Sequence, residues 1–330
     1  MKLSDFDYQL PRELIAQVPA RPRNHARLLI YDRSTKQIKD DYFYNLEKYL
    51  PAKTTLVLNN SKVEKCRLRF GNVELFVIET INPTTIRALV RPGKKFKINE
   101  ATELNLASGK KLRAKVVEMD KQGIRTFDLS LPLDSSALDP HRLTPLPPYI
   151  AQNESLSNEY QTVYADPLGS KAAPTAGLHF TAEQLIEVKG HHPIAELTLH
   201  VGLGTFASVK TENINDHIMH HEWYEVSART AATLNEAKHI MAVGTTSART
   251  LESLSRPFMA TSGQTNIFIK PGYEFKNVDA LITNFHLPKS TLLMMVSALL
   301  GSVDEMHKIY EHAINSKYRF YSFGDAMLIL

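Results

Sequence analysis

The stretch VDALITNFHLPKSTLLMMVSALLG, residues 278–301, decides the predicted fold of this chain. It reads as an apolar strand, a polar loop and an apolar helix. The stretch HIMAVGTTSARTLESL at 239–254 repeats that order, and the alternating strand AELTLHVG at 195–202 precedes both. Successive strand–loop–helix units favour a largely parallel sheet covered by helices. We therefore predict an α/β domain in which ligands gather at the carboxyl ends of the strands.

Residues 61–149 carry a different pattern. Segments such as TIRALVRPG (85–93) and IRTFDLSLP (124–132) alternate apolar and polar positions with period two, and turn residues separate them. This pattern is typical of a small antiparallel β-barrel or sandwich. We predict an inserted β-barrel domain at 61–149, which ends in the proline-rich linker LTPLPPYI, and an α/β catalytic domain formed by 1–60 and 150–330.

Positive charge gathers in the same region. Residues 61–148 hold 16 Lys and Arg against 10 Asp and Glu, although the whole chain has a formal charge of only +4. Lys94, Lys95, Lys110 and Lys111 lie in predicted turns. Such lysines are commonly solvated hairpin tips that discourage pairing between sheet edges. They also suit an electrostatic track for a phosphate backbone, and the sequence leaves both interpretations open.

Bulk composition points to a cytoplasmic enzyme. The chain has 330 residues, of which 43% are hydrophobic, enough for the cores of two domains. Its first residues, MKLSDFDYQLPRELIAQ, are too polar for a signal peptide, and its longest apolar run, TLLMMVSALLG, is shorter than a membrane span. The single cysteine, Cys66, excludes an internal disulfide framework and a four-cysteine zinc site. We expect a monomer.

The stretch AAPTAGLHFTAEQL, residues 172–185, contains a well-marked helix start. Thr181 and Gln184 have the spacing of a capping box, and Phe180 and Leu185 have that of a hydrophobic staple. Backbone N–H groups at such a start attract an acceptor. The loop that carries His179 is therefore either an ordinary connection with a hydrogen-bonded histidine or a loop that presents His179 to a ligand.

Two further loops carry polar side chains after strands. GTTSART, residues 244–250, offers backbone N–H groups, hydroxyls and Arg249 as a cradle for a carboxylate or phosphate. Ordinary N-capping by Ser247 explains part of that pattern. NFHLPKS, residues 284–290, brings an amide, an imidazole, an ammonium and a hydroxyl onto one short loop. We interpret this second loop as functional, because strand-end loops are where sites collect.

The histidine-rich segment HIMHHEWYEV, residues 217–226, raises the question of a metal. His217 and His221 are four residues apart, so a helix would place both on one face. The HExxH pattern of zinc hydrolases is absent, because the acid, Glu222, follows the second histidine. We predict no metal site and favour a general base or an anchor for a polar ligand.

Common nucleotide and hydrolase motifs do not occur. VGLGTF, residues 201–206, has Gly202 and Gly204 but lacks the third glycine of a dinucleotide fingerprint. A P-loop and a G-x-S-x-G elbow are also missing. The residues alone therefore indicate a two-domain α/β enzyme with a polar, histidine-rich site and a basic β module.

The chain resembles a known family through several long motifs in order. They are MKLSDFDYQLPRELIAQ, YQTVYA, AAPTAGLHFT, HVGLGTF, DHIMH, VGTTSARTLES, TNFHLPKSTLLM, YRF and GDAMLI, and they run from end to end. The family is that of the S-adenosylmethionine:tRNA ribosyltransferase-isomerases of queuosine biosynthesis. This resemblance implies an α/β domain that carries a smaller β-barrel domain. It also implies S-adenosylmethionine (AdoMet) as co-substrate, a tRNA partner and no prosthetic group.

The implied reaction uses AdoMet as a ribosyl donor. The ribose moiety passes to the aminomethyl group of a 7-deazaguanine base at the tRNA wobble position and rearranges to an epoxycyclopentanediol, while adenine and methionine leave. The sulfonium acidifies the C5′ protons, so a positioned base forms an ylide-like carbanion. A histidine suits this proton transfer because it titrates near neutrality.

The resemblance gives the candidate residues roles. We expect His179 or His200 to act as base, with Glu222 orienting it. Arg249 and Thr246 would hold the methionine carboxylate, and Asn284, His286 and Lys289 the ribose or base. The full set of expected substrate-binding residues is Thr175, Gly177, Thr245, Thr246, Arg249, Asn284, His286, Lys289, Ser290 and Thr291. The expected RNA-binding residues are Arg319, Lys94, Lys95, Lys110 and Lys111.

Several positions depart from the family pattern. They are Ala26, Asn60, Lys62, Lys171, Ala207 and Ser208. Asn60 replaces a carboxylate by an amide, which removes a possible base, so we assign it no catalytic role. Lys171 adds charge near a cationic ligand. Two alternatives to the family reaction are a metal-assisted hydrolase that uses the histidine run and a non-catalytic RNA-binding protein.

Overall fold

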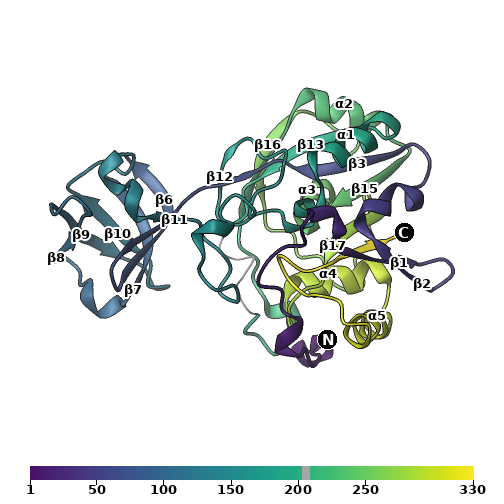
Figure 1. Ribbon diagram of the computed structural model, residues 1–330, viewed down its shortest axis with the longest axis horizontal. Coiled ribbons are helices and arrows are strands. Elements are labelled where there is room, and N and C mark those ends of the chain that lie inside the picture. The colour runs from purple at the N-terminus through teal and green to yellow at the C-terminus, as the bar shows by residue number, and fades with distance from the viewer. Residues whose placement is uncertain (203–208) are drawn as a thin grey trace. The chain divides into compact units, whose positions relative to one another are not determined.

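The computed structural model describes residues 1–202 and 209–330 (Figure 1). The chain forms two compact units, one of Met1–Lys62 with Pro147–Leu330 and one of Val63–Leu146. Residues 203–208 lie outside the described residues, and with them lie Gly204, Ala207, Ser208 and most of the HVGLGTF motif.

The large unit is built on a mixed sheet (Figure 1). In the described part of the chain this sheet has nine strands in the order β16-β14-β13-β3-β15-β17-β18-β1-β2. Their bounds are β1 Arg27–Asp32, β2 Gln37–Tyr42, β3 Thr54–Asn59, β13 Ile194–Leu199, β14 Glu222–Val226, β15 His239–Val243, β16 Thr261–Thr265, β17 Ala280–Asn284 and β18 Ala326–Ile329. A short second sheet joins β4 (Lys62–Val63) and β12 (Leu168–Ser170).

The prediction of a largely parallel sheet holds only for its centre. Strands β13, β3, β15 and β17 are parallel, whereas β14, β16 and β2 each pair antiparallel with their neighbours. Strand β2 follows β1 after four turn residues, too few for the crossover that a parallel pair needs. Strand β18 is antiparallel to β17 because two helices lie between them and return the chain to the end where β17 finished.

The sheet is buried on both faces, as alternate residues of its strands show. Leu28 and Ile30 of β1 belong to one apolar cluster, and Leu29 and Tyr31 to the other. The helices that cover the sheet are α1 Ala182–His191, α2 Ala228–Glu236, α3 Thr245–Glu252, α4 Thr291–Leu300 and α5 Val303–Asn315. No helix in the described residues is long and apolar enough to span a membrane.

The start of α1 follows the prediction in part. Thr181 is the N-cap, and its hydroxyl accepts a hydrogen bond from the Gln184 N–H at 3.2 Å. Phe180 and Leu185 pack in the same apolar cluster, as a staple requires. The Gln184 amide, however, donates to the Phe43 carbonyl at 2.8 Å. The side chain that would complete a capping box therefore anchors the helix to a distant segment.

The small unit contains one antiparallel sheet. Within the described residues its strand order is β11-β5-β6-β7-β10-β9-β8. The bounds are β5 Arg67–Phe70, β6 Val73–Asn82, β7 Thr85–Arg91, β8 Ala101–Asn105, β9 Lys111–Met119, β10 Arg125–Leu129 and β11 Arg142–Leu143. The end strands β8 and β11 do not pair with each other in the described ladder, so the predicted barrel is an open, curled half-barrel. Register shifts in β6–β7 and β9–β10 are irregularities of the kind that curve a sheet.

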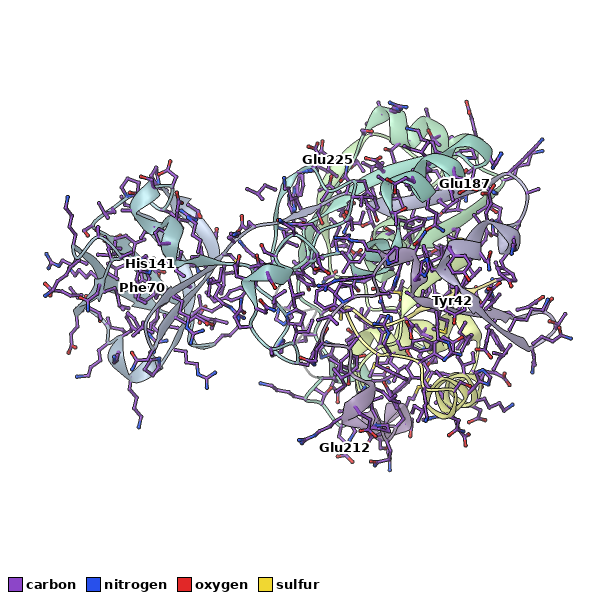
Figure 2. The ribbon with its side chains drawn as sticks, viewed as in Figure 1. Tyr42, Phe70, His141, Glu187, Glu212 and Glu225 are labelled. Atoms are coloured by element: carbon purple, nitrogen blue, oxygen red, sulfur yellow. The ribbon has the colours of Figure 1, made fainter. Side chains whose placement is uncertain are left out.

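A histidine–aromatic stack supports the core of this unit. The rings of Phe70 and His141 lie 4.5 Å apart between centroids, at 25° (Figure 2). Both nitrogens of His141 are used, since Nε2 accepts from the Ala107 N–H at 3.0 Å and Nδ1 lies 2.9 Å from the Arg69 carbonyl oxygen. With Phe70 only 6% exposed, this pair is structural.

Candidate active site

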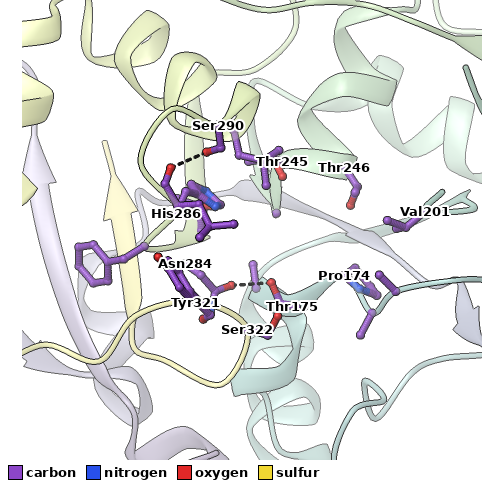
Figure 3. Close-up of a pocket in the computed structure, with 18 of the residues that line it drawn as sticks. Pro174, Thr175, Val201, Thr245, Thr246, Asn284, His286, Ser290, Tyr321 and Ser322 are labelled. Atoms are coloured by element: carbon purple, nitrogen blue, oxygen red, sulfur yellow. Dashed lines mark hydrogen bonds between the residues drawn. The ribbon is translucent and has the colours of Figure 1, made fainter. Parts of the chain in front are cut away.

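A pocket opens in the large unit at the carboxyl ends of β15 and β17 (Figure 3). Its walls come mainly from 172–176, 244–246, 283–287 and 321–322, with further residues that include Tyr149, Val201 and Ser290. It is an open hollow of about 680 Å³, a volume that includes solvent at its mouth. The residues that line it in the described part of the chain include no Asp, Glu, Lys or Arg.

The helix start at α3 forms one wall of the pocket. Gly244 is the N-cap at φ +90°, a conformation that favours glycine, and it supplies no capping side chain. Thr245 and Thr246 follow it and line the pocket, where the first N–H groups of a helix have no intrahelical acceptor. The sequence suggested Ser247 as the N-cap of this helix, but the N-cap is Gly244. Ser247 lies inside the helix and donates to the Val243 carbonyl at 2.9 Å.

Asn59 is a supporting residue that the sequence analysis missed. It is fully buried at the end of β3, and its amide donates to the Thr246 hydroxyl at 3.2 Å and to the Leu199 carbonyl at 3.0 Å. Its Oδ1 accepts from the Ser61 and Leu199 N–H groups. One amide therefore ties three elements to the pocket wall. The sequence feature that could have identified Asn59 is an asparagine at the end of an apolar strand.

The neighbouring Asn60 points elsewhere. Its Oδ1 accepts from the Thr198 hydroxyl at 2.7 Å and its amide lies 3.4 Å from Glu196. These residues line a separate polar hollow. Asn60 is thus absent from the described lining of the main pocket.

Asn284 organises the opposite wall of the pocket (Figure 3). Its Oδ1 accepts from the Thr175 hydroxyl at 3.0 Å. Its amide donates to the Tyr321 carbonyl at 3.2 Å and lies 3.1 Å from Nε2 of His179. Two predicted substrate-binding residues, Thr175 and Asn284, therefore meet here, and the amide is fully occupied by the protein.

His179 lies behind Asn284 and does not line the pocket. It is 4% exposed, and burial lowers its pKa to about 4. The ring is therefore neutral at pH 7, and its Nε2 accepts from the Asn284 amide. The expectation that this loop presents His179 to a ligand is not supported. The ring is a buried hydrogen-bonded support, because the 3-10 turn Thr175–His179 directs it inward.

His286 does line the pocket. Its Nε2 lies 2.8 Å from the Thr283 hydroxyl, and its backbone N–H donates to the Tyr310 hydroxyl at 3.0 Å. Burial lowers the pKa of His286 to about 3, so the ring is neutral. A neutral imidazole of this kind offers hydrogen bonds to a ligand without adding charge.

The side chains of residues 289–291, at the end of this loop and the start of α4, point to different places. Ser290 lines the pocket and caps α4, accepting from the Leu293 N–H at 3.2 Å. Lys289, at φ +57°, turns away and pairs with Asp7, Nζ to Oδ2 2.6 Å. Thr291 lines a second, smaller hollow. The expected contact of Lys289 with ribose therefore has no support in the pocket, because the left-handed backbone at 289 directs the side chain to the N-terminal segment.

The second hollow brings Glu222 and Arg249 together. They form a buried ion pair in which each side chain is about 5% exposed, and Glu222 also accepts from the Gly202 N–H at 2.9 Å. Nη2 of Arg249 is buried without a hydrogen-bond partner in the described residues. Leu292 lines both the hollow and the main pocket, so the two are adjacent.

His200 lies beside the pocket wall, one residue before Val201. Its ring is half-buried and stacks on Trp223, with centroids 5.2 Å apart at 17°. Burial and the nearby Lys171 lower its pKa, so the ring is neutral at pH 7. Its Nδ1 is buried and has no hydrogen-bond partner among the described residues. In His179 the Nε2 atom is engaged by the Asn284 amide, whereas the buried Nδ1 of His200 has no hydrogen bond among the described residues. Neither histidine is among the described residues that line the pocket.

Comparison with known proteins gives the family. Residues 3–329 match the family described as "Queuosine biosynthesis protein". The chain belongs to this family. The S-adenosylmethionine:tRNA ribosyltransferase-isomerases of Staphylococcus aureus strains Newman and JH9 are each 46% identical to it, with full coverage of both chains. The crystal structure of the S-adenosylmethionine tRNA ribosyltransferase from Thermotoga maritima is 38% identical over 99% of this chain and 100% of that one, with a TM-score of 0.57.

The described residues of this queuosine biosynthesis protein give no support to the metal alternative. Residues 217–221 are not helical, so the spacing of His217 and His221 does not place them on one helix face. Among the described residues, no group of three or more His, Cys, Asp or Glu could hold a metal ion.

Gly177 and Arg319 have structural partners. A Cβ on Gly177 would lie 1.9 Å from the Tyr164 hydroxyl oxygen, so glycine permits close packing there. Gly177 is not among the residues that line the pocket. Arg319 pairs with the buried Asp325 at 2.9 Å and donates to the Val18 carbonyl at 3.3 Å. Neither placement gives direct support to the expected substrate or RNA contact.

The lysines of the small unit are all exposed. Lys94 and Lys95 lie in a 3-10 turn, Gly93–Lys95, and Lys110 lies beside β9. Lys111 differs because it forms an ion pair with Glu103. The unit therefore offers exposed positive charge, most of it in turns.

Proposed function

We propose that this protein is an S-adenosylmethionine:tRNA ribosyltransferase-isomerase. It transfers the ribosyl moiety of AdoMet to 7-aminomethyl-7-deazaguanine at the tRNA wobble position and isomerises it to epoxyqueuosine, with release of adenine and methionine. The observation that carries this proposal is the end-to-end similarity to relatives of that name, at 46% identity.

AdoMet binds in the pocket at the ends of β15 and β17 in this proposal. Its carboxylate meets the first N–H groups of α3 and the hydroxyls of Thr245 and Thr246, because helix N-termini attract anions. Tyr149 and Tyr321, with ring centroids 4.7 Å apart, offer π-faces to the sulfonium. Ser290 and Thr175 supply further hydroxyls at the pocket wall.

An uncharged pocket favours the first chemical step. Removal of a C5′ proton converts the cationic sulfonium into a neutral ylide. Burial away from water disfavours the charged form of a group, so a lining that contains no Asp, Glu, Lys or Arg among the described residues assists this loss of charge.

We assign the proton acceptor to His200 and a positioning role to His179. His200 is neutral and has an unused ring nitrogen, whereas His179 is committed to Asn284. The buried pair of Glu222 and Arg249 holds the wall beside α4 and, through Gly202, the strand end that carries His200. In this arrangement Glu222 acts on the base indirectly.

In this proposal the two units have different roles toward the substrates. The unit of 1–62 and 147–330 is catalytic, and the inserted half-barrel contacts the tRNA backbone through Lys94, Lys95 and Lys110. Phosphate contacts of this kind position an RNA without reading its sequence. The enzyme acts as a cytoplasmic monomer.

The experiment is a turnover assay with AdoMet and tRNA that carries the aminomethyl-deazaguanine base. We expect adenine release that depends on both substrates, and a nucleoside with the mass of epoxyqueuosine. The reaction assignment fails if the folded protein leaves AdoMet intact and the tRNA unmodified. Loss of a general base typically costs 10²–10⁴-fold, so His200→Ala should lower the rate by about that factor, and exposed His221→Ala should not.

A further inference from the structure

Trp223 is the only tryptophan of the chain, and it is 36% exposed on β14. One face of its indole stacks on the His200 ring at 17°. The stack covers one face of the indole, and the exposed part of the side chain is available for a further contact.

Gly169 packs closely against the His200 ring. Its φ is +144°, and a Cβ there would lie 2.9 to 3.1 Å from three atoms of the His200 ring. The Gly169 backbone therefore packs closely against the imidazole that stacks on the indole. Because any larger residue at 169 would displace the ring, the glycine keeps the stack of Trp223 on His200 in place.

The stack adjoins the pocket and carries positive charge. The Lys171 N–H donates to the Val201 carbonyl at 2.8 Å, and both Val201 and Ala172 line the pocket. The Lys171 side chain is near enough to His200 to affect its titration. An aromatic face, a cation and the edge of a pocket therefore lie together.

The Phe70–His141 pair shows what a purely structural stack looks like here. Its phenyl ring is 6% exposed and both imidazole nitrogens are hydrogen-bonded. In the Trp223–His200 pair the indole is exposed and Nδ1 of the histidine has no partner in the described residues. In the second pair, therefore, part of the indole surface is not covered by the protein.

We propose that Trp223, backed by His200 and Gly169, is a stacking platform for an unpaired base of the tRNA anticodon loop, with Lys171 beside it for the phosphate. This inference rests on the proposed function, which brings such a base to the pocket. Single-stranded RNA is commonly bound by stacking its bases on aromatic side chains next to positive charge. A base stacked on this indole would take the face opposite His200, so the indole would lie between the base and the proposed proton acceptor.

The single tryptophan makes the test direct. Protein is titrated with the substrate tRNA while indole emission is followed, and the Kd is measured independently by filter binding. We expect saturable quenching with the same Kd. Trp223→Ala should weaken tRNA binding about tenfold, since loss of one base stack and a tenfold change in Kd are comparable in free energy. Trp223→Phe, which keeps a flat ring, should weaken it less than Trp223→Ala.

Ile186→Ala is the matched control, since Ile186 is an apolar side chain on α1 with 72% exposure. It should bind tRNA like the wild type. Unchanged emission at saturating tRNA, or wild-type affinity in a folded Trp223→Ala protein, overturns the platform. If quenching fails while adenine release persists, the platform alone is wrong. If quenching occurs without any AdoMet-dependent product, the proposed reaction is wrong and the platform stands.

Discussion

His179 and His200 are equivalent candidates in the sequence but not in the structure. Each lies in a motif after a strand or before a helix, and each is neutral at pH 7. His179 is 4% exposed and accepts from Asn284, so its ring supports a pocket residue. His200 is half-buried beside the pocket wall and keeps Nδ1 unused among the described residues. Two histidines of the same residue type thus differ in their hydrogen-bond partners, and this difference is the reason for proposing His200 rather than His179 as the proton acceptor.

Glu222, the third predicted catalytic residue, extends this comparison and carries the largest expected effect on stability. Glu222→Ala leaves the Arg249 guanidinium buried without its partner. Removing one member of a buried pair costs about 3–5 kcal/mol, so we expect a loss of that order in the free energy of unfolding, measured by urea denaturation. The control is Glu225→Ala, an exposed position of the same strand (Figure 2). Equal stabilities of the two variants would show that the pair is not buried as described.

His179→Ala should have the next largest effect, and on stability more than on chemistry. It leaves the buried Asn284 amide without one acceptor, a loss of about 1–3 kcal/mol. We expect a lower unfolding free energy and a reduction in adenine release of less than about tenfold. A folded variant with wild-type stability and no turnover would instead place His179 in the chemistry.

The pH dependence of stability sharpens the same distinction. The pKa of buried His179 is lowered to about 4, so the unfolded state takes up its proton first as the pH falls. Stability from this group is complete above the unfolded pKa of about 6.5 and is lost as the pH drops toward 4. In urea titrations between pH 7 and pH 4, His179→Ala should therefore lose less stability than the wild type. Parallel pH curves would contradict the burial of a neutral ring.

Gly169→Ala tests His200 without altering its chemistry. The added Cβ would lie 2.9 Å from the His200 ring, so the imidazole has to move. We expect a loss of about tenfold in adenine release, or about 1.4 kcal/mol, together with a shift in Trp223 emission. Gly190→Ala is the control, because no atom lies within 4 Å of a Cβ at that position. Normal turnover with unshifted emission would mean that the stack tolerates the methyl group.

Lys289→Ala should have the smallest effect. Its ion pair with Asp7 is more than 40% exposed on both sides, and exposed pairs contribute about 0–1 kcal/mol. We expect little change in the unfolding free energy and in the KM for AdoMet. A tenfold higher KM for AdoMet would instead support the predicted contact of Lys289 with the substrate.

The sequence predicted the features that depend on local pattern. Thr181 caps α1 as its spacing indicates, and Ala195, Leu197, Leu199 and Val201 alternate into one core. The family could also be recognised from the sequence, because its motifs are long and occur in order. What escaped depends on contacts between distant segments. Two examples are the amide of Asn59, which joins β3 to α3, and the salt bridge that turns Lys289 toward Asp7.

The sheet corrections have the same origin. Strand β18 pairs with β17 and β1 only after the chain has passed through two helices, and its direction is set by that path. Strands β11 and β8 stand at the two ends of the sheet in the small unit, and an alternating pattern does not reveal whether two such strands pair. Local periodicity thus identifies strands, and long-range pairing decides whether a sheet is parallel or closed.

The most direct measurement of the central claim is adenine release by wild type, His179→Ala and His200→Ala in parallel, with AdoMet and tRNA bearing the aminomethyl-deazaguanine base. We expect turnover by the wild type, a loss below about tenfold for His179→Ala and one of about 10²–10⁴-fold for His200→Ala. Full activity of a folded His200→Ala protein, with none in His179→Ala, would contradict the assignment of the proton acceptor. Absence of turnover in the wild type would contradict the proposed reaction itself.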